Sequence, residues 1–153
     1  MIARRHVPVI SVMTPFPVHV SSETSVIAAA SMMRGHDVRH LPVVAGGDVV
    51  GLVRAADLEL ATALTASMEL PVSRLCVVEP LVFEIDEPLE GVVRAMSAEG
   101  HDAAVVLRQG RLAGLVTTAD ICHYLWRDPE APVLLPPPAP QPFSAGPPDD
   151  GAA

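Results

Sequence analysis

The chain has 153 residues, half of them hydrophobic, and a formal net charge of −8. Its ten basic residues are all Arg, a bias typical of a GC-rich genome such as that of an actinobacterium. This acidic balance argues against nucleic acid as a partner, because neutralising phosphates requires clustered cations.

No apolar run approaches the roughly 18 residues of a membrane span, and the N-terminus lacks the apolar core of a signal peptide. Both features predict a cytoplasmic protein without a membrane partner.

The first half of the chain predicts one βαββα unit. A short apolar strand over 17–20 precedes a helix that Ser22 or Thr24 can cap. Two further strands, over 41–44 and 49–53, are joined by a turn with two glycines, and a last helix follows. The first helix has an apolar face with residues three and four positions apart, which are Val26, Ala29, Ala30 and Met33.

The second half predicts the same order of elements. A strand over 80–85 leads to a helix with Pro88 in its first turn. Strands over 104–107 and 112–116 form a second hairpin, and a last helix begins within 118–120. The apolar face of the first helix in this half consists of Leu89, Val92, Val93 and Met96.

An internal repeat relates the two halves. Shifting the chain by 63 residues places Gly-Leu-Val at 51–53 on Gly-Leu-Val at 114–116 without a gap, with eleven identities in roughly 57 positions. A unit of about 55 residues cannot bury its sheet alone, so we expect the two to pack about a pseudo-twofold axis. We predict modules over 7–64 and 70–127, and a disordered Pro-rich tail over 128–153.

Three motifs of this repeat together resemble a known family. They are Val-Met-Thr-Pro at 12–15, Arg-His-Leu-Pro-Val-Val at 39–44 and Gly-Leu-Val-Thr-Thr-Ala-Asp at 114–120. The combination is similar to the paired regulatory domains of the cystathionine-β-synthase (CBS) type, and the likeness covers residues 7–127. It implies an α+β fold, a tandem pair of βαββα CBS modules packed sheet to sheet.

The resemblance also implies a cleft between the modules that binds AMP, ADP, ATP or S-adenosylmethionine. In the family pattern, the carboxylate at the position of Asp120 accepts both ribose hydroxyls, and the Thr117 hydroxyl faces the phosphates. The first module is expected to contribute to this cleft a hydroxyl, cations for the phosphate and a rigid apolar edge for the base. The expected nucleotide-binding residues are Thr14, Pro15, Arg39, His40, Pro42, Thr117 and Asp120.

The chemistry of two of these residues is consistent with that role. The two oxygens of a carboxylate at Asp120 can accept from a vicinal diol. A Thr three residues earlier lies at a helix start, where an anion is stabilised. The same spacing is also typical of a plain helix start, with Thr117 or Thr118 as the cap and Asp120 favouring the helix dipole.

The opposite cleft has a less favourable set of residues and is expected to be degenerate. Arg54 replaces the Thr before Asp57, and Asp102 stands where the other cleft has Arg39. A carboxylate at that place repels a phosphate. Arg54 is itself a cation, however, and could take a phosphate in an altered pose. Its remaining wall is expected from Val77, Ala103 and Val105.

No catalytic or metal-binding constellation is apparent. His36-Asp37 and His101-Asp102 are adjacent turn residues without further ligands, and Cys76 and Cys122 form no Cys/His cluster. The sequence has no P-loop and no Ser-His-Asp arrangement. We therefore expect no enzyme, no catalytic cofactor and no metal.

The favoured hypothesis is a ligand sensor. An adenine nucleotide would stabilise one orientation of the two modules and so regulate a separate, unidentified protein, because no catalytic domain is fused. A homodimer is expected, since domain pairs of this family commonly associate.

The alternative is a ligand-free dimerisation or adaptor module with decayed clefts. Convergence on one cavity would favour the sensor, and residues pinned to one another or splayed would favour the adaptor. The residues that decide are Thr14, Arg39, His40, Thr117 and Asp120.

Overall fold

The computed structural model describes residues 6–64, 69–74 and 77–128. Residues 129–153 of the expected tail, and Cys76, lie outside this range. In chain order the elements are 3-10 helix η1 (Val9–Ser11), β1 (Thr14–Pro15), β2 (Val20–Ser21), α1 (Val26–His36), β3 (His40–Ala45), β4 (Asp48–Arg54), α2 (Ala55–Leu64), 3-10 helix η2 (Val72–Arg74), β5 (Val77–Val78), β6 (Val82–Glu84), α3 (Leu89–Glu99), β7 (Ala103–Arg108), β8 (Arg111–Thr117) and α4 (Thr118–Arg127).

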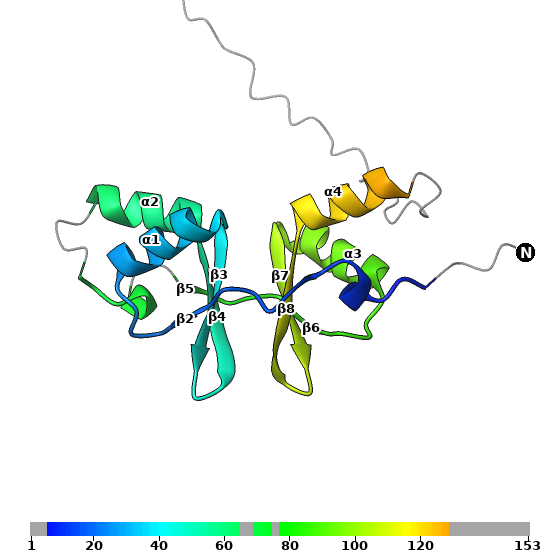
Figure 1. Cartoon of the computed structure of the whole chain (residues 1–153), viewed down its shortest axis with the longest axis horizontal. Helices are drawn as coiled ribbons and strands as arrows, with labels where there is room; N and C mark the ends of the chain where they lie inside the picture. The colour runs from blue at the N-terminus through cyan, green and yellow to red at the C-terminus, as the bar shows by residue number, and fades with distance from the viewer. Residues whose placement is uncertain (1–5, 65–68, 75–76, 129–153) are drawn as a thin grey trace, which may run out of the picture.

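The described strands form two sheets of four, in the orders β1-β8-β7-β6 and β2-β3-β4-β5. In each sheet an antiparallel hairpin, β3–β4 or β7–β8, is extended by one parallel strand, β2 or β6. Helices α1 and α2 accompany one sheet, and α3 and α4 the other (Figure 1). The two halves thus repeat one architecture, as the sequence repeat predicted.

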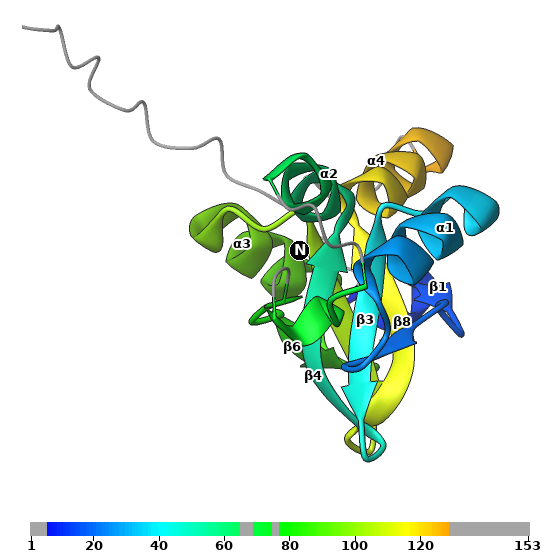
Figure 2. The same ribbon diagram turned by 90° about the vertical axis from the view of Figure 1, so that its left-hand side faces the viewer.

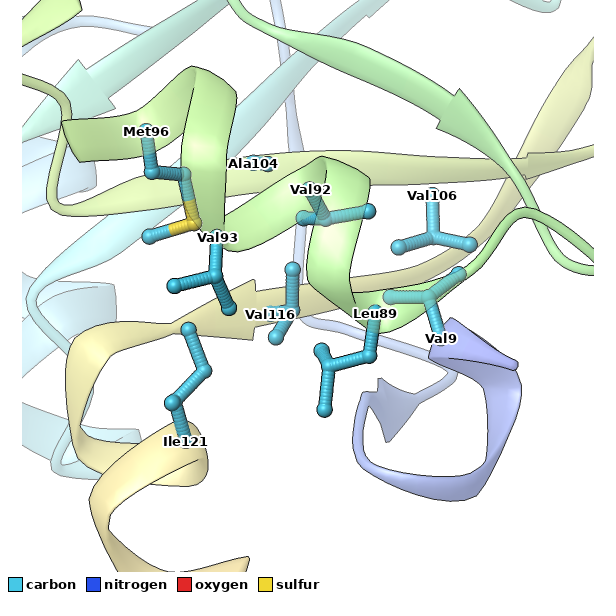
Figure 3. Packing of buried hydrophobic residues seen from close by; sticks show 9 residues of the cluster. All are labelled: Val9, Leu89, Val92, Val93, Met96, Ala104, Val106, Val116 and Ile121. Atoms are coloured by element: carbon cyan, nitrogen blue, oxygen red, sulfur yellow. The ribbon is translucent and has the colours of Figure 1, made fainter. Parts of the chain in front are cut away.

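Each half has a hydrophobic core between its helices and its sheet. Val26, Ala29 and Met33 of α1 pack with β3 and β4, and Leu89, Val92 and Met96 of α3 pack with β7 and β8. Figure 3 shows the second of these cores. The predicted apolar faces are confirmed at these positions. Their burial removes large aliphatic surfaces from water, which is the main favourable contribution to folding.

The sheets pack against each other through a third cluster. Leu52 of β4 contacts Ala103 and Val105 of β7 and Leu115 of β8. Along β7, Ala104 and Val106 face the helices instead, because successive side chains of a strand point to opposite faces. The β3–β4 hairpin overlies β8, and both hairpin turns lie at the end away from the helices (Figure 2). The expected sheet-to-sheet packing is confirmed.

The N-terminal segments of the halves are exchanged, which the repeat did not predict. β1 pairs with β8 of the other half, and β5 pairs with β4. Val9 accordingly lies fully buried among Leu89 and Val106 (Figure 3). β8 allows this close crossing because Gly114 has no Cβ. A Cβ at that position would overlap the side chain of Met13. Each hydrophobic core therefore contains residues from the opposite module.

Several local details differ from the sequence prediction. The strands expected over 17–20 and 80–85 are shorter, since β2 is only Val20–Ser21 and β6 Val82–Glu84. Ser25, not Ser22 or Thr24, caps α1 by accepting from the Ala28 N–H at 3.2 Å. Pro88 is the N-cap residue of α3 and not part of its first turn.

Candidate functional site

A cavity of about 550 Å³ lies between the two halves. This volume is within the roughly 300–1,000 Å³ of small-molecule sites. Its walls come from the segment around β1, from the α1–β3 connection, and from the β8–α4 junction. The lining residues are Thr14, Phe16, Pro17, Val18, Asp37, Val38, Arg39, His40, Asp102, Leu115, Thr117, Thr118, Ala119 and Asp120.

The β8–α4 junction holds Thr117 and Asp120 in a capping box. The Asp120 N–H donates to the Thr117 hydroxyl at 3.2 Å, and Asp120 Oδ2 accepts from the Thr117 N–H at 2.8 Å. This reciprocal pair satisfies two backbone donors at the helix start. The cap therefore fixes the carboxylate at the cavity wall, and the helix-start and site interpretations of this motif are compatible.

The second oxygen of Asp120 faces the first module. Thr14, held by the pairing of β1 with β8, donates its hydroxyl to Asp120 Oδ1 over 3.4 Å. This distance is long for an O–H···O hydrogen bond. Within the described residues, Oδ1 has no other hydrogen-bond partner, whereas Oδ2 is committed to the cap. Oδ1 is thus the oxygen that a ligand hydroxyl could use.

Arg39, at the end of the α1–β3 connection, and His40, the first residue of β3, both line the cavity. The Arg39 side chain is exposed and forms no ion pair within the described part of the chain, while its carbonyl accepts from the Ala55 N–H. His40 instead donates from Nε2 to Asp102 Oδ1 at 3.0 Å. Only one of the two expected cations is therefore unpaired at this wall.

Asp102 occupies a place that the sequence did not predict. We expected it only in the opposite cleft, but the structure puts it on the wall of this cavity, beside His40. Burial alone raises the pKa of Asp102, yet the hydrogen bond from His40 and attraction to His40 and Arg54 outweigh it, so the pKa lies below its usual value. Asp102 is therefore a carboxylate at neutral pH.

Two expected residues do not line the cavity. Pro15 pairs with Gly114 in β1 and is exposed, and Pro42 is buried in β3 opposite Leu52. Pro42 lies two residues after the cavity-lining His40, on the same face of β3 but outside the lining of the cavity, so its apolar edge contributes to the packing of the sheet. The structure brings together the other five expected residues, Thr14, Arg39, His40, Thr117 and Asp120.

On the opposite side, Arg54 and Asp57 are engaged with each other. Arg54 Nε and Nη2 donate to the two oxygens of Asp57 at 2.7 and 2.9 Å, and this hydrogen bonding raises the pKa of Arg54. The bidentate geometry neutralises the carboxylate that corresponds to Asp120. Ala103 and Val105, expected in this cleft, are buried between the sheets. Val77 lies in β5, and its side chain is outside the described atoms.

Sequence reasoning missed several lining residues. Phe16 is 92% exposed and has a φ of +49°, and Pro17 and Val18 continue the same wall. The only available signal was their position directly after the Val-Met-Thr-Pro motif. Asp37 was interpreted as a solvated turn residue, but as the left-handed C-cap of α1 it also borders the cavity.

A model of the CBS domain matches the chain twice, over residues 9–63 and 72–127. These matches cover most of the chain and coincide with the two halves of the structure. The chain belongs to the CBS domain family. The sequence resemblance is thereby confirmed.

Solved structures of CBS domain pairs are similar to this chain. The CBS domain pair of protein MJ0100, in complex with 5′-methylthioadenosine and S-adenosyl-L-methionine, shares 25% identity at a TM-score of 0.71 and covers 78% of this chain and 99% of its own. The structure of CBSX2 in complex with AMP shares 25% sequence identity with this chain at a TM-score of 0.67, and the match covers 78% of this chain and 96% of CBSX2. A putative acetoin utilization protein (AcuB) from Vibrio cholerae shares 21% sequence identity at a TM-score of 0.75, and the match covers 82% of this chain and 96% of that protein. At this identity the likeness supports the fold alone. No curated protein sequence matches.

The described part of this CBS pair contains neither a helix long and apolar enough to cross a membrane nor a group of three or more His, Cys, Asp or Glu side chains suited to a metal ion. A second hollow of about 390 Å³ lies between α1 and α2 and shares Asp37, Val38 and Arg39 with the cavity between the modules. Its other walls are side chains of the two helices, including the polar Arg34, Glu59 and Thr62.

Proposed function

We propose that this CBS pair is a regulatory module that binds an adenosyl ligand, such as AMP, ADP, ATP or S-adenosylmethionine, in the cavity between its halves. The observation that carries this proposal is the convergence of Thr14, Arg39, His40, Thr117 and Asp120 on one cavity. These residues come from segments far apart in the sequence, and no element of the fold alone requires them to share a wall.

The arrangement suits an adenosine in three respects. Asp120 Oδ1 can accept from a ribose hydroxyl in place of the long contact with Thr14. Phe16, Val18 and Leu115 offer apolar surface to a base. The first turn of α4 presents the positive end of the helix dipole to the 5′ substituent. The complexes of the MJ0100 pair and of CBSX2 support this class of ligand.

A ligand in this cavity would touch both modules at once. A ligand that binds one orientation of the modules more tightly shifts the population toward that orientation. The size of the shift is limited by the difference between its affinities for the two orientations. The proposed output is a changed surface that a separate, regulated protein contacts. The proposal includes no catalysis by this chain, a cytoplasmic location and a homodimer as the working assembly.

The decisive experiment is a thermal-shift panel of AMP, ADP, ATP, S-adenosylmethionine and NAD. An adenosyl ligand at 100 times its Kd should contribute about 2.7 kcal/mol, which raises the Tm by about 5–10 °C. Asp120→Ala should abolish the shift measured against its own ligand-free Tm. Asp57→Ala, which removes the corresponding carboxylate of the other module, should retain it.

Two results would contradict the proposal. No shift with any adenosyl compound would favour the ligand-free adaptor, in which the contacts of Asp120 and His40 only hold the modules together. A shift that survives Asp120→Ala but disappears in Asp57→Ala would place the ligand in the opposite cleft.

A further inference from the structure

The charges on the cavity wall are unevenly balanced. Three carboxylates line it, those of Asp37, Asp102 and Asp120, against a single guanidinium, that of Arg39. His40 also lines it, but its Nε2 donates to Asp102 at 3.0 Å. With His40 neutral the wall carries a net charge of about −2, and with His40 protonated about −1. In neither state does the wall offer a surplus of positive charge to a phosphate.

Asp102 also stands beside the helix start that would receive a 5′ phosphate. Its carbonyl accepts from the N–H of Thr118 at 3.0 Å and from the Thr118 hydroxyl at 3.3 Å. These bonds tie Asp102 to the first residue of α4, whereas its side chain reaches back to His40. A phosphate approaching the N-terminus of α4 would meet the Asp102 carboxylate, and the helix dipole would be opposed by a full negative charge.

We infer that the cavity selects adenosyl ligands whose 5′ substituent is neutral or positively charged, such as the sulfonium of S-adenosylmethionine, over adenosine phosphates. The inference rests on the proposed function and specifies its ligand. In the proposed pose Asp120 holds the uncharged ribose, which leaves Asp37 and Asp102 as the wall carboxylates whose charge acts on the 5′ substituent. They attract a sulfonium and repel a phosphate.

A series of ligands with one nucleoside and different 5′ charges tests this selection. Isothermal titration would compare AMP, 5′-methylthioadenosine, S-adenosylhomocysteine and S-adenosylmethionine on the full chain. We expect AMP to bind most weakly and S-adenosylmethionine most tightly, by about tenfold or more. S-adenosylhomocysteine lacks only the methyl group and the positive charge of S-adenosylmethionine. It should therefore bind more weakly than S-adenosylmethionine.

Asp102→Asn should reduce the ratio of AMP to S-adenosylmethionine dissociation constants about tenfold, because it removes one negative charge from the cavity wall while keeping an oxygen that can accept from His40. The side chain of Asp102 is 64% exposed, so this variant should fold. Asp37→Asn provides a second variant with the same expected direction. Asp48→Asn, an exposed acid at the start of β4 outside the cavity, should leave the ratio unchanged.

Tighter binding of AMP than of S-adenosylmethionine by the wild-type chain would overturn the inference while leaving the proposed function intact. A ratio unchanged in both Asp102→Asn and Asp37→Asn would also overturn it, because selection would then not depend on these charges. Absence of binding by all four compounds, together with no thermal shift from ADP or ATP, would instead refute the proposed function itself.

Discussion

Phe16 combines an exposed aromatic ring with an unfavourable backbone. Its side chain is 92% exposed and its φ is +49°, while its N–H donates to the Ala113 carbonyl. The left-handed region costs an L-residue about 1–2 kcal/mol. The pairing of β1 with β8 imposes this conformation, because the chain must leave the sheet immediately after Pro15.

Substitution of Phe16 should reveal this strain. We expect Phe16→Gly to be more stable than Phe16→Ala by about 1 kcal/mol, because glycine adopts a positive φ without a steric cost. At an exposed site with an unstrained backbone, the alanine variant would be as stable as the glycine variant or more stable. Urea denaturation of the two variants measures the difference, and a more stable alanine variant would show that the backbone at residue 16 is unstrained.

The start of α4 and the start of α2 are corresponding elements with different chemistry. α4 begins with the capping box of Thr117 and Asp120, and α2 begins after Arg54, whose guanidinium pairs with Asp57. One residue type at one repeat position therefore decides whether the carboxylate is held by a helix cap or by an ion pair. Only the cap leaves Asp120 Oδ1 directed at a cavity.

Removal of the cap should weaken α4. We expect Thr117→Ala to lower the free energy of unfolding by about 1 kcal/mol, because the Asp120 N–H loses its acceptor. Thr117→Ser keeps the hydroxyl and should retain most of the stability. Chemical denaturation followed by far-UV circular dichroism gives both values. Equal losses in the two variants would mean that the methyl group, and not the cap, matters.

At the scale of the whole molecule, the exchange of segments joins the modules into one folding unit. Val9 and Val72 correspond in the repeat, and each is fully buried in a core formed mainly by the opposite half. The Val9 and Leu89 N–H groups also donate to carbonyls of the opposite segment, those of Glu87 and Val7. Neither core is complete without the other half, so the modules should unfold together.

Calorimetry and a core substitution test this coupling. We expect a single transition whose calorimetric and van't Hoff enthalpies agree. Val9→Ala should lower the free energy of unfolding of the whole molecule by about 2 kcal/mol, through lost burial and a cavity. Ile10→Ala, at a neighbouring residue that is 38% exposed, should cost less. Two separate transitions would show that the modules fold independently.

The sequence by itself determined the repeat, the order of elements and the apolar faces of the helices. These features are local or periodic, so Met33 and Met96 could be placed in corresponding cores from spacing alone. It also predicted that Thr14 and Asp120 share a site, but through resemblance to a family and not through pattern. The shortened strands and the Ser25 cap were missed because tertiary contacts set element boundaries within a few residues.

Only the tertiary structure decided the exchange of β1 and β5 and the electrostatics of the cavity. His40 and Asp102 are 62 residues apart in the chain, and their hydrogen bond exists because the two sheets pack with these strand starts side by side. A gapless repeat cannot show which module a segment packs against, because both choices bury the same apolar residues. The balance of charge around a ligand is therefore a property of the packed pair of sheets.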